Sequence, residues 1–274
     1  MISLLVPFRA SGPDDVRIRS WEWIRRRWET MFPEAELCIG TDEGEPFSKC
    51  VAVNDAYRKS SGDMLVIVDA DSWVERDAVS TGIRIAENKE HLVVPWWKAY
   101  RFNEDLSEVM IGCDPAGPNP VTAAMKKECD GTGPSPASAA MVLCIQRVAF
   151  ERVGGMDPRF RGWGSEDVSF GLSCWTLLGR NEYSMGEAYG LYHPQPLNDD
   201  GFRIWDNDEG MRNMALYDRY ADAQADPWAM TALCSEHPLE GARMPIGPAP
   251  TLDPGDLIAM PGREKFITAP IAQA

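Results

Sequence analysis

Two carboxylates, Asp69 and Asp71, directly follow a run of five apolar residues, 64–68. The run is rich in β-branched residues and predicts a strand that is buried on both faces, as in a parallel sheet covered by helices. Carboxylates at the end of such a strand lie at the sheet edge where α/β proteins bind ligands. Their oxygens could hold a hard divalent cation. The alternative is a polar strand-to-helix turn in which Asp69 or Asp71 caps the helix.

A second group of polar and aromatic residues lies in the sequence Gly162-Trp163-Gly164-Ser165-Glu166-Asp167. The glycines that flank Trp163 allow the backbone to bend and to present the indole outward, where it could pack on a sugar ring. Glu166 and Asp167 begin an apolar helical segment, and acidic residues there commonly do no more than complement the helix dipole. The functional interpretation is that one of the two carboxylates is a general base.

His193 is one of three histidines, and it ends an apolar stretch that begins at Gly190. A single histidine is more often structural than a ligand. Its place at the end of a predicted strand, in a chain that already has an Asp-x-Asp sequence, makes it a candidate metal ligand. Imidazole together with carboxylates suits manganese and its neighbours.

The elements that must position these groups follow from hydrophobic periodicity. Apolar runs at 2–6 and 35–39 predict two strands, and the spacing of the large apolar residues at 21–31 predicts a helix between them. A strand–helix–strand unit has a right-handed crossover, so Pro7 and Asp42 should lie at the same sheet edge as Asp69. These elements are typical of the mononucleotide-binding half of a doubly wound sheet. No Gly-x-Gly-x-x-Gly turn is present, which argues against a dinucleotide cofactor.

Composition excludes some classes of protein. The chain has 274 residues and a formal net charge of −15, which argues against a long nucleic acid as partner. A small anionic ligand remains compatible, because a metal and a few basic side chains can invert the charge locally. No run approaches the roughly 20 apolar residues of a membrane span, and the first residues carry no basic leader. Seven cysteines without paired spacing favour reduced thiols in a cytoplasmic protein.

Taken in this order, the motifs of residues 1–195 resemble those of a GT-A glycosyltransferase of the family-two type. The second half is similar to the catalytic domain of the β-1,4-galactosyltransferases and the polypeptide N-acetylgalactosaminyltransferases. The resemblance implies an α/β fold whose Rossmann-like sheet is mixed, mostly parallel and flanked by helices. It also implies a UDP-sugar donor, Mn²⁺ or Mg²⁺, and a hydroxyl-bearing acceptor that is a glycan, a protein or a small molecule.

The resemblance assigns the donor side of the site. Pro7-Phe8-Arg9 resembles the Pro-Phe-Arg turn that holds uridine diphosphate, and Asp42 occupies the position that contacts uracil. Phe47-Ser48-Lys49 resembles a second donor-binding patch, with a basic residue near the phosphates. Asp69-Ala70-Asp71 is the Asp-x-Asp motif, in which Asp71 binds the metal directly and Asp69 lies nearer the ribose and the waters of the metal.

The acceptor side is assigned in the same way. The sequence 162–167 resembles Trp-Gly-Gly-Glu-Asp, in which Trp163, Gly164 and Glu166 contact the sugars and Asp167 is the catalytic base. Trp97 belongs to an aromatic stretch that is either core or a stacking surface, and we assign it to the acceptor site. His193 corresponds to the distal metal ligand. Two departures are Gly190, where the family has a further methionine ligand, and 168–169, which end the acidic run.

We therefore expect a single GT-A domain over residues 1–236. It comprises a nucleotide-sugar half (1–100), an acceptor and catalytic half (101–200) and a packing helix (200–236). A Pro-rich extension, 237–274, either lies on this or a neighbouring subunit or is disordered. The segment 112–136, rich in Gly, Pro, Asp and Lys, predicts a long mobile loop that could close over the donor.

The sequence thus predicts a metal-dependent inverting glycosyltransferase in which Asp167 is the general base. Two alternatives remain. A sugar-phosphate nucleotidyltransferase also uses acidic metal ligands, but it needs a basic Gly-rich loop after the first strand, and 8–12 is a poor one. A non-catalytic protein that binds carbohydrate or nucleotide sugar would keep the cleft without turnover. The oligomeric state does not follow from the sequence.

Overall fold

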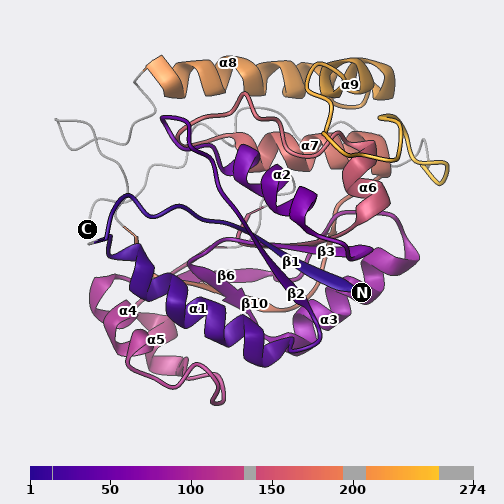
Figure 1. Ribbon diagram of the computed structural model, residues 1–274. Helices are drawn as coiled ribbons and strands as arrows, with labels where there is room; N and C mark the ends of the chain where they lie inside the picture. Colours follow the sequence, from indigo (N-terminus) through magenta and orange to yellow (C-terminus); the bar gives the residue numbers. More distant parts are fainter. Residues whose placement is uncertain (14, 133–139, 194–207, 253–274) are drawn as a thin grey trace.

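The computed structural model describes residues 1–13, 15–132, 140–193 and 208–252. A central sheet lies between two layers of helices, and a further pair of helices covers one of those layers (Figure 1). Within the described residues the central sheet has the strand order β2-β1-β3-β8-β5-β9. Its strands are β1 (Ile2–Pro7), β2 (Glu36–Gly40), β3 (Met64–Val68), β5 (Val93–Val94), β8 (Val142–Gln146) and β9 (Glu182–Tyr183).

The pairing of these strands brings three loops to one edge. β1 pairs in parallel with both β2 and β3, so the chain leaves all three strands at the same side of the sheet. β8 runs antiparallel to β3 and to β5, and β5 runs parallel to β9. The predicted fold class, an α/β fold with a mixed and mostly parallel sheet flanked by helices, is confirmed.

Helices cover both faces of this sheet (Figure 1). α1 (Arg17–Met31) and α3 (Arg76–Asn88) lie on one side, and α2 (Lys49–Lys59), α6 (Arg147–Arg152) and α7 (Glu166–Leu178) lie on the other. The apolar residues of α1 that predicted the helix, including Trp28, are buried. α2 begins at Lys49, because the hydroxyl of Ser48 accepts a hydrogen bond from the backbone N–H of Val51 and caps its first turn.

A second sheet was only partly predicted. Its order is β4-β10-β6-β7, with strands β4 (Ser72–Val74), β6 (Lys98–Arg101), β7 (Asp130–Thr132) and β10 (Glu187–Gly190). These strands are three or four residues long, so their periodicity is too short to be recognised in the sequence. Gly190 pairs with Ser72 across β10 and β4. The sheet therefore brings the segment that ends at His193 beside the segment that contains Asp71.

The segment predicted as a mobile loop, 112–136, is anchored as far as residue 132. It contains α5 (Ala123–Lys127) and β7 and follows α4 (Glu104–Ile111). From α1, the indole N–H of Trp23 donates to the carbonyl of Cys113 at 2.9 Å, and Arg27 donates to the carbonyl of Gly117 at 2.5 Å. Lys126 forms an ion pair with Glu187 of β10. The expectation of a long loop without regular structure is wrong for residues 112–132, and 133–136 lie outside the described part of the chain.

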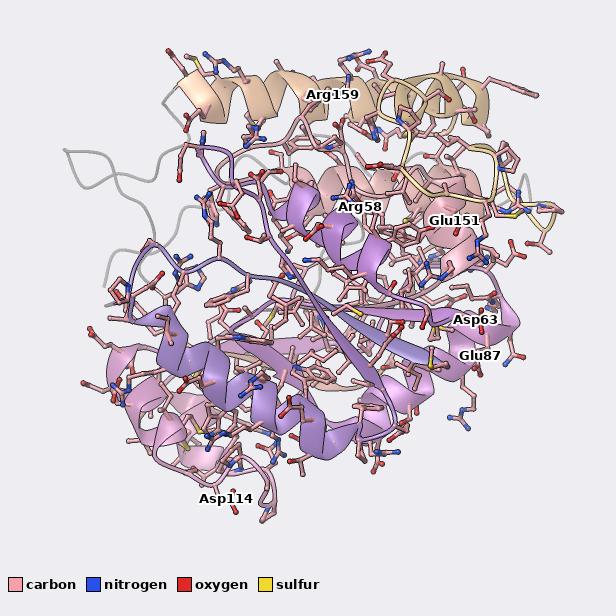
Figure 2. All side chains as sticks on the ribbon, in the orientation of Figure 1. Arg58, Asp63, Glu87, Asp114, Glu151 and Arg159 are labelled. Carbon is pink, nitrogen blue, oxygen red and sulfur yellow. The ribbon has the colours of Figure 1, made fainter. Side chains whose placement is uncertain are left out.

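Two helices and a C-terminal segment complete the fold. α8 (Asp208–Ala223) and α9 (Pro227–Cys234) lie over α7, where a single packing helix was predicted. Of the Pro-rich extension, residues 237–252 are described and pack on the same domain. The buried carboxylate of Glu151 on α6 (Figure 2) accepts hydrogen bonds from the backbone N–H groups of Arg243 and Met244, each at 2.9 Å. Residues 253–274 of the extension lie outside the described ranges.

None of the helices in the described ranges combines the length and the apolar composition that a membrane crossing requires. No disulfide joins the seven cysteines, all of which belong to the described part of the chain.

Trp28 connects α1 to the backbone next to the Asp-x-Asp sequence. Its indole N–H donates to the carbonyl of Ser72 at 3.1 Å, and its ring is fully buried and stacks on Phe32. We expect Trp28→Phe to lower the free energy of unfolding by about 1–3 kcal/mol, because it leaves that buried carbonyl without its donor and creates a small cavity. Urea denaturation measures this.

The matched control is Trp228→Phe, because Trp228 is 79% exposed. It should change the free energy of unfolding by less than about 0.5 kcal/mol. Equal stability of the two variants would contradict the role assigned to Trp28.

Candidate active site

Lys49 lies between two carboxylates that come from distant parts of the sequence. Its Nζ is 2.7 Å from Oδ1 of Asp69 and 2.8 Å from Oδ1 of Asp167. Asp69 follows β3, Lys49 is the first residue of α2 and Asp167 is the second residue of α7. Less than a quarter of the Lys49 and Asp167 side chains is exposed, so the attractions are only partly screened by water. The two motifs that suggested chemistry therefore meet at one sheet edge.

The Asp71 and His193 side chains are in direct contact. Nδ1 of His193 is 2.6 Å from Oδ2 of Asp71, and the hydroxyl of Ser72 donates to Oδ1 of Asp71 at 2.8 Å. The hydrogen bond that Nδ1 of His193 donates to Asp71 raises the pKa of His193. Burial alone would raise the pKa of Asp71, but the hydrogen bond and charge of His193 hold it below its usual value. Two of the predicted metal ligands are thus close enough to share one ion.

Met141 fixes the backbone and the side chain of Asp69. The N–H of Asp69 donates to the carbonyl of Met141 at 2.8 Å, and the N–H of Met141 donates to Oδ2 of Asp69 at 3.1 Å. Met141 is buried and has φ 65°. A non-glycine residue in this left-handed region is strained, and such strain persists only where the surrounding structure imposes it. Met141 was not predicted from the sequence.

The Asp167 carboxylate titrates near neutral pH. Burial raises its pKa to about 7, the attraction of Lys49 opposes this, and the negative charges of Glu166 and Asp69 add to the increase. Whereas Asp167 contacts Lys49, the neighbouring Glu166 contacts the backbone: its Oε2 accepts a hydrogen bond from the N–H of Gly164 at 3.1 Å. A carboxylate with a pKa close to neutral can accept a proton efficiently from a reacting hydroxyl.

The backbone around Trp163 has an unusual conformation. Gly162, Gly164 and Ser165 all have positive φ, at 68°, 109° and 70°, so the bend predicted at the glycines is present. The N–H of Gly162 donates to the carbonyl of Phe47 at 3.0 Å. Trp163 is half-buried. This bend sets the start of α7 and with it the position of Asp167.

Arg9 organises the loop that follows β2. Its guanidinium donates to the carbonyls of Asp42 at 2.7 Å and Gly44 at 2.9 Å, and it pairs with Glu45 at 2.7 Å. The same group lies over the ring of Phe47, 5.2 Å from its centroid. The predicted donor residues Arg9 and Phe47 therefore touch one another, and three of the guanidinium contacts hold the loop.

Asp42 is buried, and its carboxylate is engaged within the protein. Oδ1 accepts from the N–H of Gly44 at 3.1 Å, and Oδ2 accepts from the N–H of Ser48 and from Arg161, both at 2.9 Å. Hydrogen bonds from these donors hold its pKa below the usual value although burial acts in the opposite direction. Asp42 therefore holds the shape of the loop between β2 and α2, residues 41–48, which we call the donor-side loop because the sequence predicts donor-binding residues in it.

The remaining predicted residues divide into two groups. Pro7, Phe8 and Ala70 lie at the shared strand edge, since Pro7 pairs with Gly40 and Ala70 follows β3. Trp97 lies elsewhere: its N–H donates to the carbonyl of Gly186, just before β10, whereas His193 follows the other end of β10. Its side chain is 52% exposed. Trp97 is not part of the contacts that join the other residues.

Arg161 and Asn213 were also missed by sequence reasoning. Arg161 donates to Asp42 and to the carbonyl of Pro46 at 3.0 Å, which joins the loop before α7 to the loop before α2. A basic residue directly before Gly162-Trp163 was the available signal for it. Asn213 of α8 contacts the same loop from the opposite side, and nothing in its local sequence indicates this.

The donor atoms present fit a divalent cation that also binds substrate. In the described ranges, no group of three or more His, Cys, Asp or Glu residues converges on one point. Asp71 and His193 supply one carboxylate and one imidazole, which suits Mn²⁺. A cation bound through few protein ligands completes its coordination with substrate phosphates and water. Gly190 adds no ligand.

Comparison with known families supports the resemblance seen in the sequence. The family model of the N-terminal domain of galactosyltransferase matches residues 122–178. The matched segment runs from α5 to the end of α7 and includes Trp163, Glu166 and Asp167. The predicted resemblance to the galactosyltransferases is thereby confirmed for this segment, which is well under half of the chain. A search of curated proteins finds no match.

The chain also resembles solved structures of a GalNAc-T and of a galactosyltransferase. The crystal structure of GalNAc-T7 with UDP, GalNAc and Mn²⁺ has 15% sequence identity and a TM-score of 0.48, and the match covers 83% of this chain and 48% of that one. Drosophila β-1,4-galactosyltransferase 7 with manganese, UDP-Gal and xylobiose has 15% identity, a TM-score of 0.43 and coverages of 66% and 63%. The chain thus spans less than two thirds of the length of each of these two proteins.

Ser165 offers a test of the bend before α7. It has φ 70°, and its hydroxyl is 3.5 Å from the sulfur of Met214. We expect Ser165→Gly to stay within about 1 kcal/mol of the wild type, because glycine adopts this conformation without strain but gains freedom in the unfolded chain. Ser165→Val should cost about 1–3 kcal/mol. Chemical denaturation of both variants measures the difference, and a valine variant as stable as the glycine variant would show that the bend is absent.

Proposed function

We propose that this protein is a metal-dependent, inverting glycosyltransferase that moves a sugar from a UDP-sugar to an acceptor hydroxyl. The observation that carries the proposal is the position of Lys49, 2.7 Å from Asp69 and 2.8 Å from Asp167. Lys49 thus connects two parts of the site. One is the end of β3, where Asp71 and His193 are paired, and the other is Asp167, whose pKa burial raises to about 7. The galactosyltransferase family match over 122–178 supports the same class of enzyme.

The donor would bind at the strand edge. UDP and Mn²⁺ are present in the GalNAc-T7 structure, and the donor atoms of Asp71 and His193 are suited to holding such a cation here. A bound divalent cation would supply Lewis-acid stabilisation of the charge on the leaving diphosphate. Lys49 and Arg9 contribute further positive charge at the same edge, and Phe47 and the loop that Arg9 organises border the nucleotide.

The acceptor would bind beside Trp163 and Gly164. Asp167 accepts the proton of the acceptor hydroxyl while that oxygen forms a bond to the anomeric carbon. The bond to the diphosphate breaks on the opposite face, so the anomeric configuration inverts. The transition state has oxocarbenium character, as in glycoside hydrolysis. Glu166 is held by the N–H of Gly164, which places a second carboxylate where it can accept hydrogen bonds from a sugar. The acceptor class and a cytoplasmic location stay predictions.

The direct test is a screen of UDP-galactose, UDP-N-acetylgalactosamine, UDP-N-acetylglucosamine and UDP-glucose for UDP release with and without Mn²⁺. Xylobiose, N-acetylglucosamine and a Ser/Thr peptide serve as acceptor probes. We expect Mn²⁺-dependent UDP release from at least one donor, and its loss in the presence of EDTA and in Asp71→Ala. Absence of release from every donor would contradict the proposal. Release of pyrophosphate from UTP and a sugar 1-phosphate would instead identify a nucleotidyltransferase.

Asp167→Asn tests the base. The amide cannot accept the proton, so we expect transfer to fall by at least about 10²-fold, while UDP binding measured by calorimetry stays close to that of the wild type. The matched control is Asp63→Asn, because Asp63 is 93% exposed and precedes β3 at the opposite end of that strand. It is labelled in Figure 2. Near-normal turnover in Asp167→Asn would exclude Asp167 as the base.

The pH dependence follows from the pKa of Asp167. A general base acts when it is deprotonated, and burial raises the pKa of Asp167 to about 7. The value of kcat/KM, which reports groups of the free enzyme, should therefore increase with pH through about 7 and level off above it. A kcat/KM that is constant or decreases between pH 6 and pH 8, roughly one unit on each side of that pKa, would contradict the assignment.

A further inference from the structure

Asn213 of α8 has its side chain buried against the loop that we call the acceptor loop, residues 160–165. Only 4% of Asn213 is exposed. Its Nδ2 donates to the carbonyl of Arg161 at 2.8 Å and lies 3.4 Å from the carbonyl of Trp163. Its Oδ1 accepts from the N–H of Arg161 at 3.4 Å. One amide side chain therefore contacts the backbone on both sides of Gly162.

The backbone of the acceptor loop is irregular, so some of its polar groups find their partners outside the loop. Three of its residues have positive φ, and buried backbone polar groups without partners are costly. The opposite side of the loop is held by the donor-side loop, through Gly162 N–H to the carbonyl of Phe47 at 3.0 Å and through the Arg161–Asp42 ion pair at 2.9 Å. Asn213 contacts the backbone of the same loop from α8.

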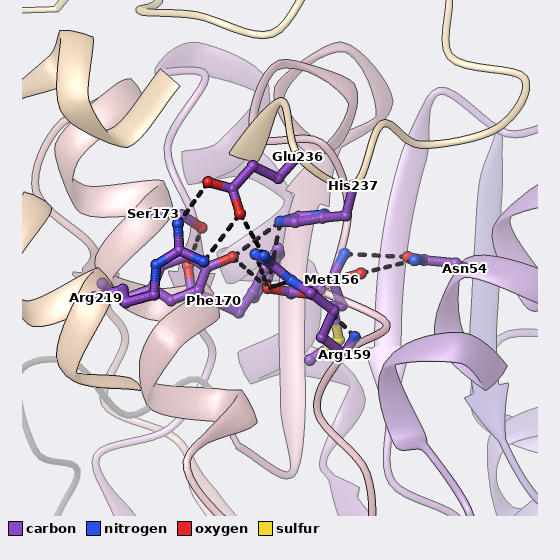
Figure 3. A network of polar contacts seen from close by, with 10 residues as sticks. Asn54, Met156, Arg159, Phe170, Ser173, Arg219, Glu236 and His237 are labelled. Atoms are coloured by element: carbon purple, nitrogen blue, oxygen red, sulfur yellow. Dashed lines mark hydrogen bonds and ion pairs between the residues drawn. The ribbon is translucent and has the colours of Figure 1, made fainter. Parts of the chain in front are cut away.

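α8 is itself firmly anchored. The hydroxyl of Tyr220 lies 3.0 Å from Oδ2 of Asp157 and 2.9 Å from Nε2 of His237, inside the domain. Arg219 pairs with Glu236 at 2.5 Å, and the same carboxylate pairs with Arg159 (Figure 3). The helix that carries Asn213 is thus tied to the chain before and after it, which makes it a rigid support for a precise contact.

We propose that Asn213 is a positioning residue that holds the acceptor loop so that Trp163 and the first turn of α7 face the acceptor sugar. This rests on the proposed function, since it assigns a role in acceptor binding. Asn213 lies behind the backbone of the loop and acts through Trp163. Its removal should therefore affect acceptor use far more than donor use.

The experiment compares Asn213→Ala and the milder Asn213→Ser with Glu151→Gln. Glu151 is as deeply buried and accepts hydrogen bonds from Tyr57 and from two backbone N–H groups of the C-terminal segment. Glu151→Gln therefore weakens the fold without touching the acceptor loop. Three readouts are used: the Mn²⁺-dependent hydrolysis of the UDP-sugar without acceptor, the KM for the acceptor probe, and hydrogen exchange of peptides that cover 160–166.

In Asn213→Ala we expect kcat/KM for the acceptor to fall roughly 10- to 100-fold, because a small displacement of a positioned group is sufficient for such a loss. Donor hydrolysis and the KM for the donor should remain within about threefold of the wild type. Hydrogen exchange in 160–166 should become faster. Asn213→Ser should show the same pattern with smaller changes. Glu151→Gln should leave donor hydrolysis, the KM for the acceptor and hydrogen exchange in 160–166 unchanged.

Two results would overturn the proposal. One is unchanged hydrogen exchange in 160–166 in both Asn213 variants, a measurement that requires no substrate. The other is an equal loss of donor hydrolysis and acceptor transfer, which would mean that Asn213 supports only general stability. Failure of the proposed function can be told apart from failure of this proposal. If the proposed function is wrong, the wild type itself releases no UDP, and the hydrogen-exchange comparison still shows whether Asn213 holds the acceptor loop.

Discussion

The ammonium group of Lys49 lies between the carboxylates of Asp69 and Asp167, and the rest of the site depends on this contact. Without Lys49 between them, the two partly buried carboxylates would repel each other. Lys49 is also the first residue of α2, where the helix dipole disfavours a cation, so the two acids compensate for an otherwise unfavourable position. Lys49 therefore stabilises the charged form of both carboxylates, and the two carboxylates together stabilise the ammonium group of Lys49. The contact joins β3, α2 and α7 at one point.

The parts of the fold around this contact serve to bring its members together. The parallel strands β1, β2 and β3 deliver three loops to one edge. The second sheet places the chain before His193 beside the chain after Asp71. On the other side, Gly162, Gly164 and Ser165 turn the backbone so that α7 begins with Glu166 and Asp167 at the same edge. Contacts from Arg161 and Asn213 hold that turn from both sides.

Much of this was predictable because the signals are local. The apolar run before Asp69 and Asp71, the periodicity at Trp28 and the glycines around Trp163 each define their own element. Contacts between distant residues have no such signal, and nothing in the sequence next to Met141 or Asn213 indicates the contacts that these two residues make. The short strands of the second sheet escaped recognition for the same reason. A local signal can also mislead about position. The aromatic residues around Trp97 suggested a binding surface near the other site residues, but the pairing of β6 with β10 puts Trp97 at the end of β10 that is opposite to His193.

The central claim is that Asp71 and His193 hold a divalent cation beside the base-bearing end of α7. The most direct measurement is an anomalous difference map at the manganese absorption edge, from crystals grown with UDP and Mn²⁺. The account predicts one strong peak bonded to the carboxylate of Asp71 and the imidazole of His193, with diphosphate oxygens completing the coordination. A manganese peak at another place, or bound UDP with the Asp71–His193 pair intact and no metal between them, would contradict it.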